Sequence, residues 1–219
     1  MLTATKIRYT GDVQEVRRLT DETIVLRIDR GNIDFEPGQY VRIGVDGDSE
    51  IRDYSIYSGN EKPYIEVLLR RVEDGLVSKQ LFDLKEGDRV MVGGPYGHFK
   101  LLDSIKEKPL LFIATGTGIS PYRSFIESYD NLNYKLIHGT SYLNEAYEKE
   151  IYGDKYFHCV SREKKGDFNG RVTDYIKNID FSSDTNAFLC GNCDMIYDVF
   201  DLLQERGLPT GQIHTEVYF

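Results

Sequence analysis

Short runs in which apolar and polar positions alternate fill the first hundred residues, and clusters of Asp, Gly, Pro and Asn separate them. The strands that this pattern predicts are Lys6–Thr10, Thr23–Ile28, Gln39–Val45, Ile51–Tyr57, Tyr64–Arg70 and Arg89–Val92. One helix is expected near Ser78–Leu84, with Ser78 as its N-cap. Six strands at regular spacing predict a small antiparallel β-barrel, because closing the sheet removes its exposed edges.

From Pro109 onward the pattern changes, and strand-like runs alternate with helix-like ones. Strands are predicted at Leu110–Thr115, Tyr134–His138, Tyr156–Val160, Ala187–Leu189 and Gln212–Val217, and helices at Pro121–Ser128, Asn144–Ile151, Val172–Asn178 and Asp194–Arg206. A parallel sheet with crossover helices requires this alternation. We therefore predict a two-domain α+β protein, in which an antiparallel barrel over residues 1–102 precedes an α/β domain with a parallel sheet over residues 103–219.

Composition limits the classes of function. The 219 residues are 40% hydrophobic and 12% aromatic, which suits packed cores, and the net charge of −9 argues against a nucleic-acid partner. No apolar run approaches the ~20 residues of a membrane helix, and the N-terminus lacks a signal-peptide core. We expect a cytoplasmic protein without membrane insertion, as a monomer or weak dimer. Three cysteines and four scattered histidines suggest neither a disulfide framework nor a metal site.

The turn Gly116-Thr117-Gly118 is the most informative motif. It joins a strand-like run to a helix start near Pro121, and backbone N–H groups in such a turn can hold a phosphate. Pro121 stands where the dinucleotide-binding fingerprint has its third glycine, so an ordinary strand-to-helix connection is an equally good interpretation of the turn alone.

The segment Ser161–Lys165 follows the third strand of this half. A hydroxyl beside guanidinium and ammonium groups, at the carboxyl end of a strand, suits a 2′-phosphate and favours NADP over NAD. The alternative interpretation of this segment is a solvated run of charges.

Three motifs of the first half suit a flat, phosphate-bearing cofactor. Arg52-Asp53-Tyr54-Ser55 lies in a predicted strand, where Arg52 and Tyr54 share one face and Ser55 the other. Gly75–Ser78 places amides and a hydroxyl at the start of a helix, and the glycine-dense corner Gly93–Phe99 lets a flat group approach the backbone. Taken singly, the three are an ordinary strand, a capped helix and a barrel turn.

Read in order, Arg-x-Tyr-Ser, Gly-x-x-Ser, Gly-Pro-x-Gly-x-Phe, Gly-Thr-Gly-x-x-Pro and Cys-Gly resemble the ferredoxin–NADP(+) reductase family over nearly the whole chain. The resemblance implies a barrel that binds FAD and a following domain that binds NADP(H). The implied flavin contacts are Arg52 and Ser78 on the pyrophosphate, Tyr54 against the isoalloxazine and Ser55 facing its N5, with Gly75 and Val77 beside them. The implied nucleotide contacts are Thr117 and Gly118 at the pyrophosphate and Ser161 and Arg162 at the 2′-phosphate, and Gly116 and Gly191 are further expected cofactor-binding residues.

The same resemblance assigns Cys190 to the nicotinamide pocket and places Glu216, Tyr218 and Phe219 near the flavin. Ser55, Cys190, Glu216 and Tyr218 are then the expected catalytic residues, and which terminal aromatic stacks on the ring stays open. Alternatively, Val217 and Phe219 finish a buried edge strand. The Cys190-x-x-Cys193 spacing has a rival interpretation as a thiol–disulfide site, since a helix dipole would lower the pKa of Cys190.

The implied function is hydride transfer between NADP(H) and FAD, with single electrons passed to or from ferredoxin or flavodoxin. The chain has no four-cysteine cluster for an iron–sulfur centre of its own. Arg70, Arg71, Lys79 and Lys100 are candidates for a positive docking patch, or else scattered solvated charges. Two other functions stay open: an NAD(P)H-dependent flavin reductase or oxygenase reductase component, and a non-catalytic FAD-carrying electron-transfer subunit.

Overall fold

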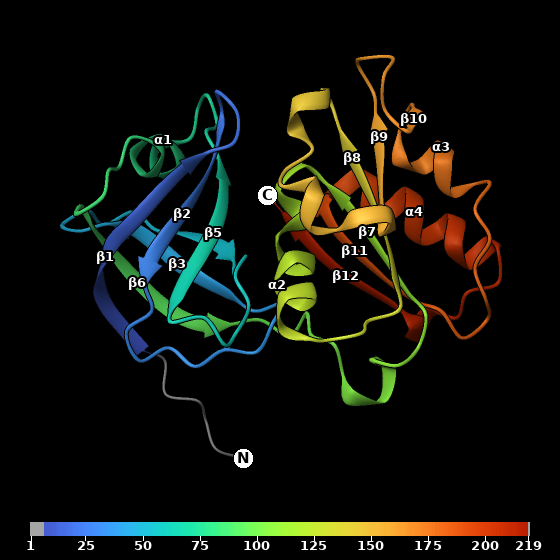
Figure 1. Cartoon of the computed structure of the whole chain (residues 1–219), viewed down its shortest axis with the longest axis horizontal. Helices are drawn as coiled ribbons and strands as arrows, with labels where there is room; N and C mark the ends of the chain where they lie inside the picture. Colours follow the sequence, from blue (N-terminus) through green and yellow to red (C-terminus); the bar gives the residue numbers. More distant parts are fainter. Residues whose placement is uncertain (1–6, 219) are drawn as a thin grey trace. The chain divides into compact units, whose positions relative to one another are not determined.

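The computed structural model describes residues 7–218, which form two compact units (Figure 1). The first unit contains residues 7–100 together with the segment Ser120–Tyr129. The second contains Leu101–Ile119 and the chain from Asp130 onward.

The first unit is built on a six-stranded antiparallel sheet in the order β4-β3-β6-β1-β2-β5. Its strands are β1 (Ile7–Arg18), β2 (Thr23–Asp29), β3 (Tyr40–Val45), β4 (Arg52–Ser55), β5 (Tyr64–Arg70) and β6 (Arg89–Tyr96). An antiparallel bridge between Ile56 and Val67 joins the two ends of this order and nearly closes the sheet into a barrel. The barrel prediction is therefore confirmed.

Inward side chains of alternate strand residues fill the barrel, as Ile24, Leu26 and Ile28 of β2 illustrate. Helix α1 (Leu76–Phe82) packs its apolar face on the same core through Val77, Leu81 and Phe82. Helix α2 (Ser120–Ser128) also belongs to this unit, and its Tyr122 and Phe125 rings lie about 6 Å from the ring of Phe99. The first unit thus takes its core from two separate stretches of the chain.

Strand β1 is longer than predicted, because it serves two partners. Its first half pairs with β6 and its second half with β2, and the register shifts between Val13 and Glu15. A bulge of this kind bends the strand and interrupts the simple alternation of apolar and polar residues. The sequence pattern therefore ended at Thr10, although the strand continues to Arg18.

The second unit is a six-stranded sheet in the order β10-β9-β8-β7-β11-β12, and all its pairs are parallel. The strands are β7 (Leu110–Thr115), β8 (Tyr134–Thr140), β9 (Tyr156–Val160), β10 (Phe168–Asn169), β11 (Asn186–Asn192) and β12 (Ile213–Tyr218). Helices α3 (Val172–Ile176) and α4 (Cys193–Glu205) pack Ile176, Val199 and Leu203 into one hydrophobic cluster with the sheet. The predicted parallel sheet with helices is confirmed.

The helix expected at Asn144–Ile151 is wrong. Short 3₁₀ turns occupy the region instead, at Leu143–Glu145, Lys149–Ile151 and Gly153–Lys155. The carboxylate of Glu145 accepts the amides of Ser141 and Tyr142 at 2.8 and 3.0 Å, and Glu148 adopts a left-handed conformation with φ of 48°. A residue in the left-handed conformation interrupts an α-helix, so residues 144–151 do not form the predicted helix.

Candidate cofactor-binding sites

The strand that carries the first flavin motif is β4, in the first unit. Arg52 and Tyr54 lie opposite Ile43 and Val41 of β3, whereas Ser55 lies opposite Tyr40. The strand therefore alternates regularly, with Arg52 and Tyr54 on one face. Tyr40 also pairs with Tyr96, so β3 connects this motif to the glycine-dense corner at the end of β6.

The three side chains of this motif differ in exposure. The Arg52 side chain is 61% exposed, and its guanidinium contacts only near neighbours, with Nη1 donating to the Ile51 carbonyl at 2.8 Å and lying 3.4 Å from Glu50. Tyr54 packs against the barrel core, and this burial raises the pKa of its hydroxyl to about 12. Ser55 is buried. A charged group that reaches solvent beside a neutral, half-buried ring suits a cofactor with a phosphate and an aromatic system.

Helix α1 begins differently from the prediction. Gly75 is its N-cap, and Ser78 is the third helical residue, so the N-cap assignment of Ser78 is wrong. The Ser78 hydroxyl instead accepts the amide of Val72 at 3.1 Å, which closes the turn before the helix. A Cβ on Gly75 would lie 2.5 Å from the Ser78 hydroxyl, so a side chain at this position would displace that hydroxyl from the Val72 amide. Val77 points into the barrel core, which leaves only its backbone for a phosphate.

In the second unit, the glycine turn after β7 meets the end of β11. A Cβ on Gly118 would overlap the carbonyl oxygen of Cys190 and lie 2.7 Å from the Cα of Gly191. Gly191 itself has φ of 125°, and its own Cβ would lie 2.7 Å from the Thr115 carbonyl oxygen. The Asn192 amide donates to the Thr115 hydroxyl at 2.9 Å. The backbone of the glycine turn therefore lies directly against the backbone at the end of β11, more than seventy residues away in the sequence.

The turn also has open space on one side. A Cβ placed on Gly116, whose φ is 52°, would have nothing within 4 Å. On the other side, the Gly116 carbonyl accepts a hydrogen bond from the buried ring of His138 in β8, with 2.8 Å between Nε2 and the oxygen. An open, glycine-lined turn that precedes a helix fits a nucleotide pyrophosphate. Sequence reasoning missed His138, for which the position at the carboxyl end of a predicted strand was the only available signal.

Cys190 lies in β11 beside β12, where the parallel register places it opposite Glu216 and places Asn192 opposite Tyr218. The Cys190 side chain is fully buried. Burial and the Glu216 carboxylate raise the pKa of its thiol well above the usual value, and the Tyr218 side chain opposes them more weakly. Phe219, the other terminal aromatic of the prediction, lies outside the described residues.

A protonated, buried thiol does not suit the thiol–disulfide interpretation. That interpretation required a helix dipole to lower the pKa of Cys190, but Cys190 belongs to the strand and Cys193 is the residue at which α4 begins. All three cysteines of the chain are free thiols in the structure. Among residues 7–218, no three His, Cys, Asp or Glu side chains form a group that could hold a metal ion.

The candidate 2′-phosphate residues lie where β9 ends, next to the end of β8. Ser161 donates both its amide and its hydroxyl to the Thr140 carbonyl, at 3.0 and 3.1 Å. Arg162 is exposed, and its guanidinium contacts Tyr142 with 3.4 Å between Nη1 and the phenol oxygen. Tyr142 was not among the predicted site residues, because it falls in a loop without periodicity.

This loop is held by a chain of hydrogen bonds. The Thr140 hydroxyl donates to the Tyr142 carbonyl at 2.9 Å, so the hydroxyl accepts from Nε2 of His158, 2.7 Å away. The carboxylate of Glu163 accepts the Leu143 amide at 2.6 Å and so links the segment after β9 to the loop after β8. A hydrogen-bonded backbone with one exposed guanidinium beside it suits an anionic group.

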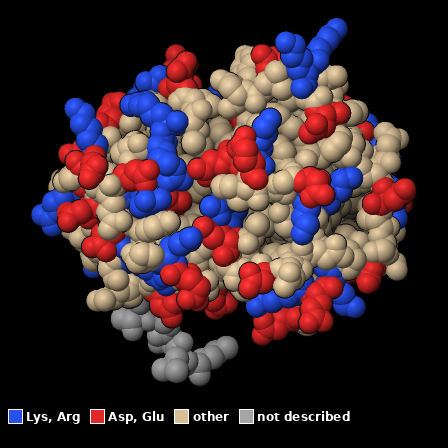
Figure 2. Space-filling model, in the orientation of Figure 1, with Lys and Arg blue, Asp and Glu red and all other residues tan. Residues whose placement is uncertain are grey.

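The proposed positive docking patch is weaker than the sequence suggested. Arg71 pairs with Glu22 and Lys100 with Glu36, each at 2.8 Å. Figure 2 shows basic and acidic side chains intermixed over the visible face. Two of the four cations are therefore already neutralised by neighbouring carboxylates.

Within the part of the chain that the structure describes, no helix has the length and apolar character to cross a membrane.

Family models match both halves of the chain. Residues 11–101 match an oxidoreductase FAD-binding domain and residues 112–201 an oxidoreductase NAD-binding domain. The two cofactor classes expected from the sequence, FAD and a nicotinamide dinucleotide, are thereby confirmed.

Two curated relatives and two solved structures illustrate the range of similar proteins. The ferredoxin–NADP reductase of Pseudomonas aeruginosa is 31% identical, over 91% of this chain and 90% of its own length. The toluate 1,2-dioxygenase electron transfer component of Pseudomonas putida is 29% identical, over 96% and 67% respectively.

Among solved structures, the ferredoxin NADP+ reductase of Neisseria gonorrhoeae with bound FAD and NADP has the same fold, with a TM-score of 0.83 at 22% identity over 97% of this chain and 99% of that one. The flavohemoglobin of Malassezia yamatoensis matches with a TM-score of 0.86 at 19% identity over 97% of this chain, which spans only 60% of that longer chain. The motifs, the two cofactor-binding domains and the relative that matches along most of both lengths agree, and the chain belongs to the ferredoxin–NADP reductase family of flavoprotein oxidoreductases.

Proposed function

We propose that this chain carries reducing equivalents between NADP(H) and a one-electron carrier protein, ferredoxin or flavodoxin, by way of FAD. Bound FAD supplies the conversion between two-electron and one-electron chemistry. The observation that best supports a nucleotide with a 2′-phosphate is the exposed Arg162 beside Ser161 and Tyr142 at the carboxyl end of β9. A guanidinium that pairs with the 2′-phosphate favours NADP over NAD, because NAD lacks that phosphate.

In the first unit, the Arg52 guanidinium and the Ser78 turn would hold the flavin pyrophosphate, with Gly75 allowing close approach and the backbone of Val77 facing the anion. Tyr54 would lie against the ring system and Ser55 would present its hydroxyl to the ring nitrogen. Support comes from the exposure of Arg52 and from the neutral, half-buried phenol of Tyr54. These roles are positional, since the cofactor carries the chemistry.

In the second unit, Gly116, Thr117 and Gly118 would hold the nucleotide pyrophosphate, and Gly191 would let the nicotinamide approach the backbone. Cys190 would present an uncharged thiol, because burial and Glu216 keep it protonated. Tyr218, which follows Glu216 on the same strand, would take part in covering the flavin. A protonated thiol beside a carboxylate provides one neutral and one negative group for a ring whose charge changes during hydride transfer.

Replacing Arg162 by alanine is expected to raise the KM for NADPH about 30-fold, because a charge-assisted contact of ~2 kcal/mol is lost. The KM for NADH should change less than about twofold, since NADH lacks the 2′-phosphate. Steady-state kinetics with both cofactors measure the effect. Lys177→Ala serves as the control, since Lys177 is an exposed cation of the same unit that pairs with Asp174 at 2.9 Å. Equal losses for NADPH and NADH in the Arg162 variant would refute the assignment.

A second candidate function is that of an oxygenase reductase component. The relative from Pseudomonas putida favours it, since that electron transfer component is similar over 96% of this chain. The neutralised cations Arg71 and Lys100 also argue against a strongly basic dock for an acidic carrier.

The acceptor can be identified by its dependence on salt. If ferredoxin or flavodoxin docks through charge, its reduction should slow at least fivefold between about 0.05 and about 0.5 M salt, while NADPH–ferricyanide activity stays nearly constant. Reduction of free flavin in preference to either protein, with no salt dependence, would favour the reductase-component function. Absence of NADPH–ferricyanide activity in the purified FAD-loaded chain would favour a non-catalytic subunit.

A further inference from the structure

The nucleotide turn rests on a histidine that is not part of any of the motifs above. His138 lies in β8 at the edge where the strands of the second unit end, and its ring is fully buried. Nε2 lies 2.8 Å from the carbonyl oxygen of Gly116, and Nδ1 lies 2.8 Å from the hydroxyl of Tyr156. Both ring nitrogens therefore have a partner.

The direction of these two hydrogen bonds follows from the chemistry of the partners. A carbonyl oxygen only accepts, so Nε2 of His138 carries a proton and donates it to Gly116. Burial lowers the pKa of His138 to about 3, with a smaller contribution from the neighbouring His158, so the ring is neutral. Nδ1 is then an acceptor, and the Tyr156 hydroxyl donates to it. The ring is held in a single tautomer and a single orientation.

The bond to Gly116 determines how one peptide plane of the turn is oriented. In a trans peptide the carbonyl and the following N–H point in opposite directions. Because the Gly116 carbonyl points at His138, the amide of Thr117 points away from it. Gly116 has φ of 52° and no side chain, so its own conformational preference does not select one orientation of this plane.

We propose that His138 is a positioning residue for the nicotinamide nucleotide, because its Nε2–H holds the Gly116–Thr117 peptide in the orientation that presents the turn to the pyrophosphate. The inference rests on the proposed function, since it requires this turn to bind a dinucleotide. His138 contacts the turn through the backbone carbonyl of Gly116, so its effect should be on affinity and not on the chemical step.

Two substitutions separate the two ring nitrogens. In His138→Gln the side-chain amide reaches the position of Nε2 and can still donate to the Gly116 carbonyl. In His138→Asn the shorter amide reaches only the position of Nδ1, near Tyr156, so the Gly116 carbonyl loses the donor that His138 Nε2 supplies. Both variants replace a buried aromatic ring by a smaller amide, so they share the general cost of altered packing.

The experiment titrates NADP+ into the FAD-loaded, oxidised protein by calorimetry and measures urea unfolding of the same samples. We expect His138→Asn to weaken NADP+ binding about tenfold and His138→Gln less than about threefold, with similar losses of stability and full flavin occupancy in both. In kinetics, His138→Asn should raise the KM for NADPH and leave kcat nearly unchanged.

Equal weakening by the two variants, or affinities that merely follow their stabilities, would overturn the positioning role. Wild-type affinity in His138→Asn would overturn it as well. If the wild-type protein itself does not bind NADP+ or NAD+ while it retains FAD, the proposed function fails, and the inference fails with it. The wild-type titration therefore distinguishes the two failures.

Discussion

Replacing Gly118 by alanine should destabilise the second unit by about 3 kcal/mol and weaken NADP+ binding more than tenfold. The added Cβ would overlap the Cys190 carbonyl oxygen and lie 2.7 Å from two further backbone atoms, the Cys190 carbonyl carbon and the Gly191 Cα. Backbone atoms of a central strand cannot rotate away as a flexible side chain would. The turn after β7 would have to move off the end of β11, and this movement would also displace the candidate pyrophosphate site.

Urea unfolding and calorimetric titration measure these two effects. Gly211→Ala is the matched control, because a Cβ at Gly211 would have nothing within 4 Å and its φ lies outside the left-handed region. That variant should match the wild type in both measurements. A Gly118→Ala protein with wild-type stability and affinity would show that the close approach of these two strand ends is not required.

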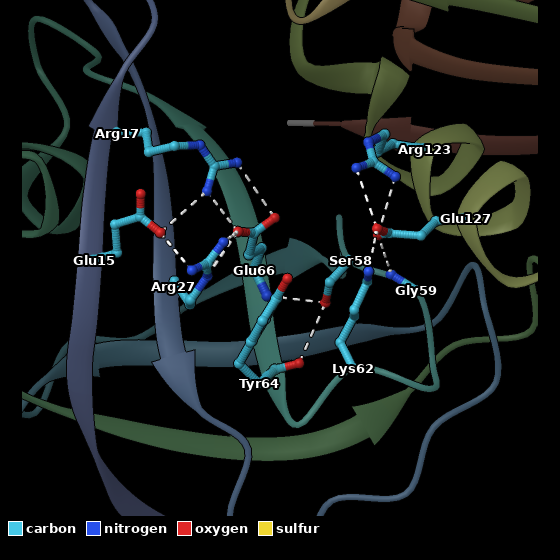
Figure 3. Close-up of polar contacts among 10 residues, drawn as sticks. All are labelled: Glu15, Arg17, Arg27, Ser58, Gly59, Lys62, Tyr64, Glu66, Arg123 and Glu127. Carbon is cyan, nitrogen blue, oxygen red and sulfur yellow. Dashed lines mark hydrogen bonds and ion pairs between the residues drawn. The ribbon is translucent and has the colours of Figure 1, made fainter. Parts of the chain in front are cut away.

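Replacing Glu66 by alanine should destabilise the first unit by about 3–5 kcal/mol. Glu66 lies in β5 with its side chain only 4% exposed, and its carboxylate is bound by two guanidinium groups, Arg17 at 2.6 Å and Arg27 at 2.8 Å (Figure 3). Glu15 pairs with Arg27 at 2.6 Å and completes a balanced group of four charges. Removing the central carboxylate leaves two half-buried cations that repel each other, with the Glu15 carboxylate beside both of them.

The same residue also supports the segment that follows the flavin motif. The Glu66 amide donates to the Ser58 hydroxyl at 3.0 Å, and its carbonyl accepts the Tyr57 amide at 2.7 Å. Both are hydrogen bonds of the Glu66 backbone, which alanine keeps, so we expect Glu66→Ala to lower stability while the folded protein retains its FAD content. Measurements of urea unfolding and flavin absorbance per chain test both expectations.

Glu15→Ala is the control for this prediction, since the Glu15 side chain is 37% exposed and an exposed ion pair contributes less than about 1 kcal/mol. A similar loss of stability in the two variants would contradict the central role of Glu66. So would a Glu66→Ala protein that is as stable as the wild type.

Most strands could be predicted from the sequence because short runs of β-branched and apolar residues, some with a period of two, end at clusters of polar turn residues. Thr23–Asp29 and Tyr64–Arg70 show this, since their predicted and observed limits agree within one residue. The prediction failed where a local interaction broke the period: at the bulge after Val13 in β1, and at Glu148, whose left-handed conformation ends the turn that a helix would have continued.

The candidate site divides in the same way. Motifs within a few residues of each other, such as Arg52–Ser55 or Gly116–Gly118, are visible in the sequence because one turn or strand supplies the whole arrangement. The roles of the individual side chains toward the cofactors remain predictions, and Phe219 lies outside the described residues. Tyr142 and His138 carry no such local pattern, and only the positions of neighbouring strands bring them beside Arg162 and Gly116.

The sequence by itself determined the two successive kinds of domain, the order of the strands along the chain and the classes of cofactor, because these depend on periodicity and on short motifs. Only the tertiary structure decided that Gly118 and Gly191 lie too close to neighbouring backbone for a side chain, that burial raises the pKa of the Cys190 thiol and that His138 donates to the Gly116 carbonyl. Each of these properties depends on atoms that lie far apart in the chain. A contact between distant segments leaves no trace in local spacing, since its strength depends on the approach and the burial that folding creates.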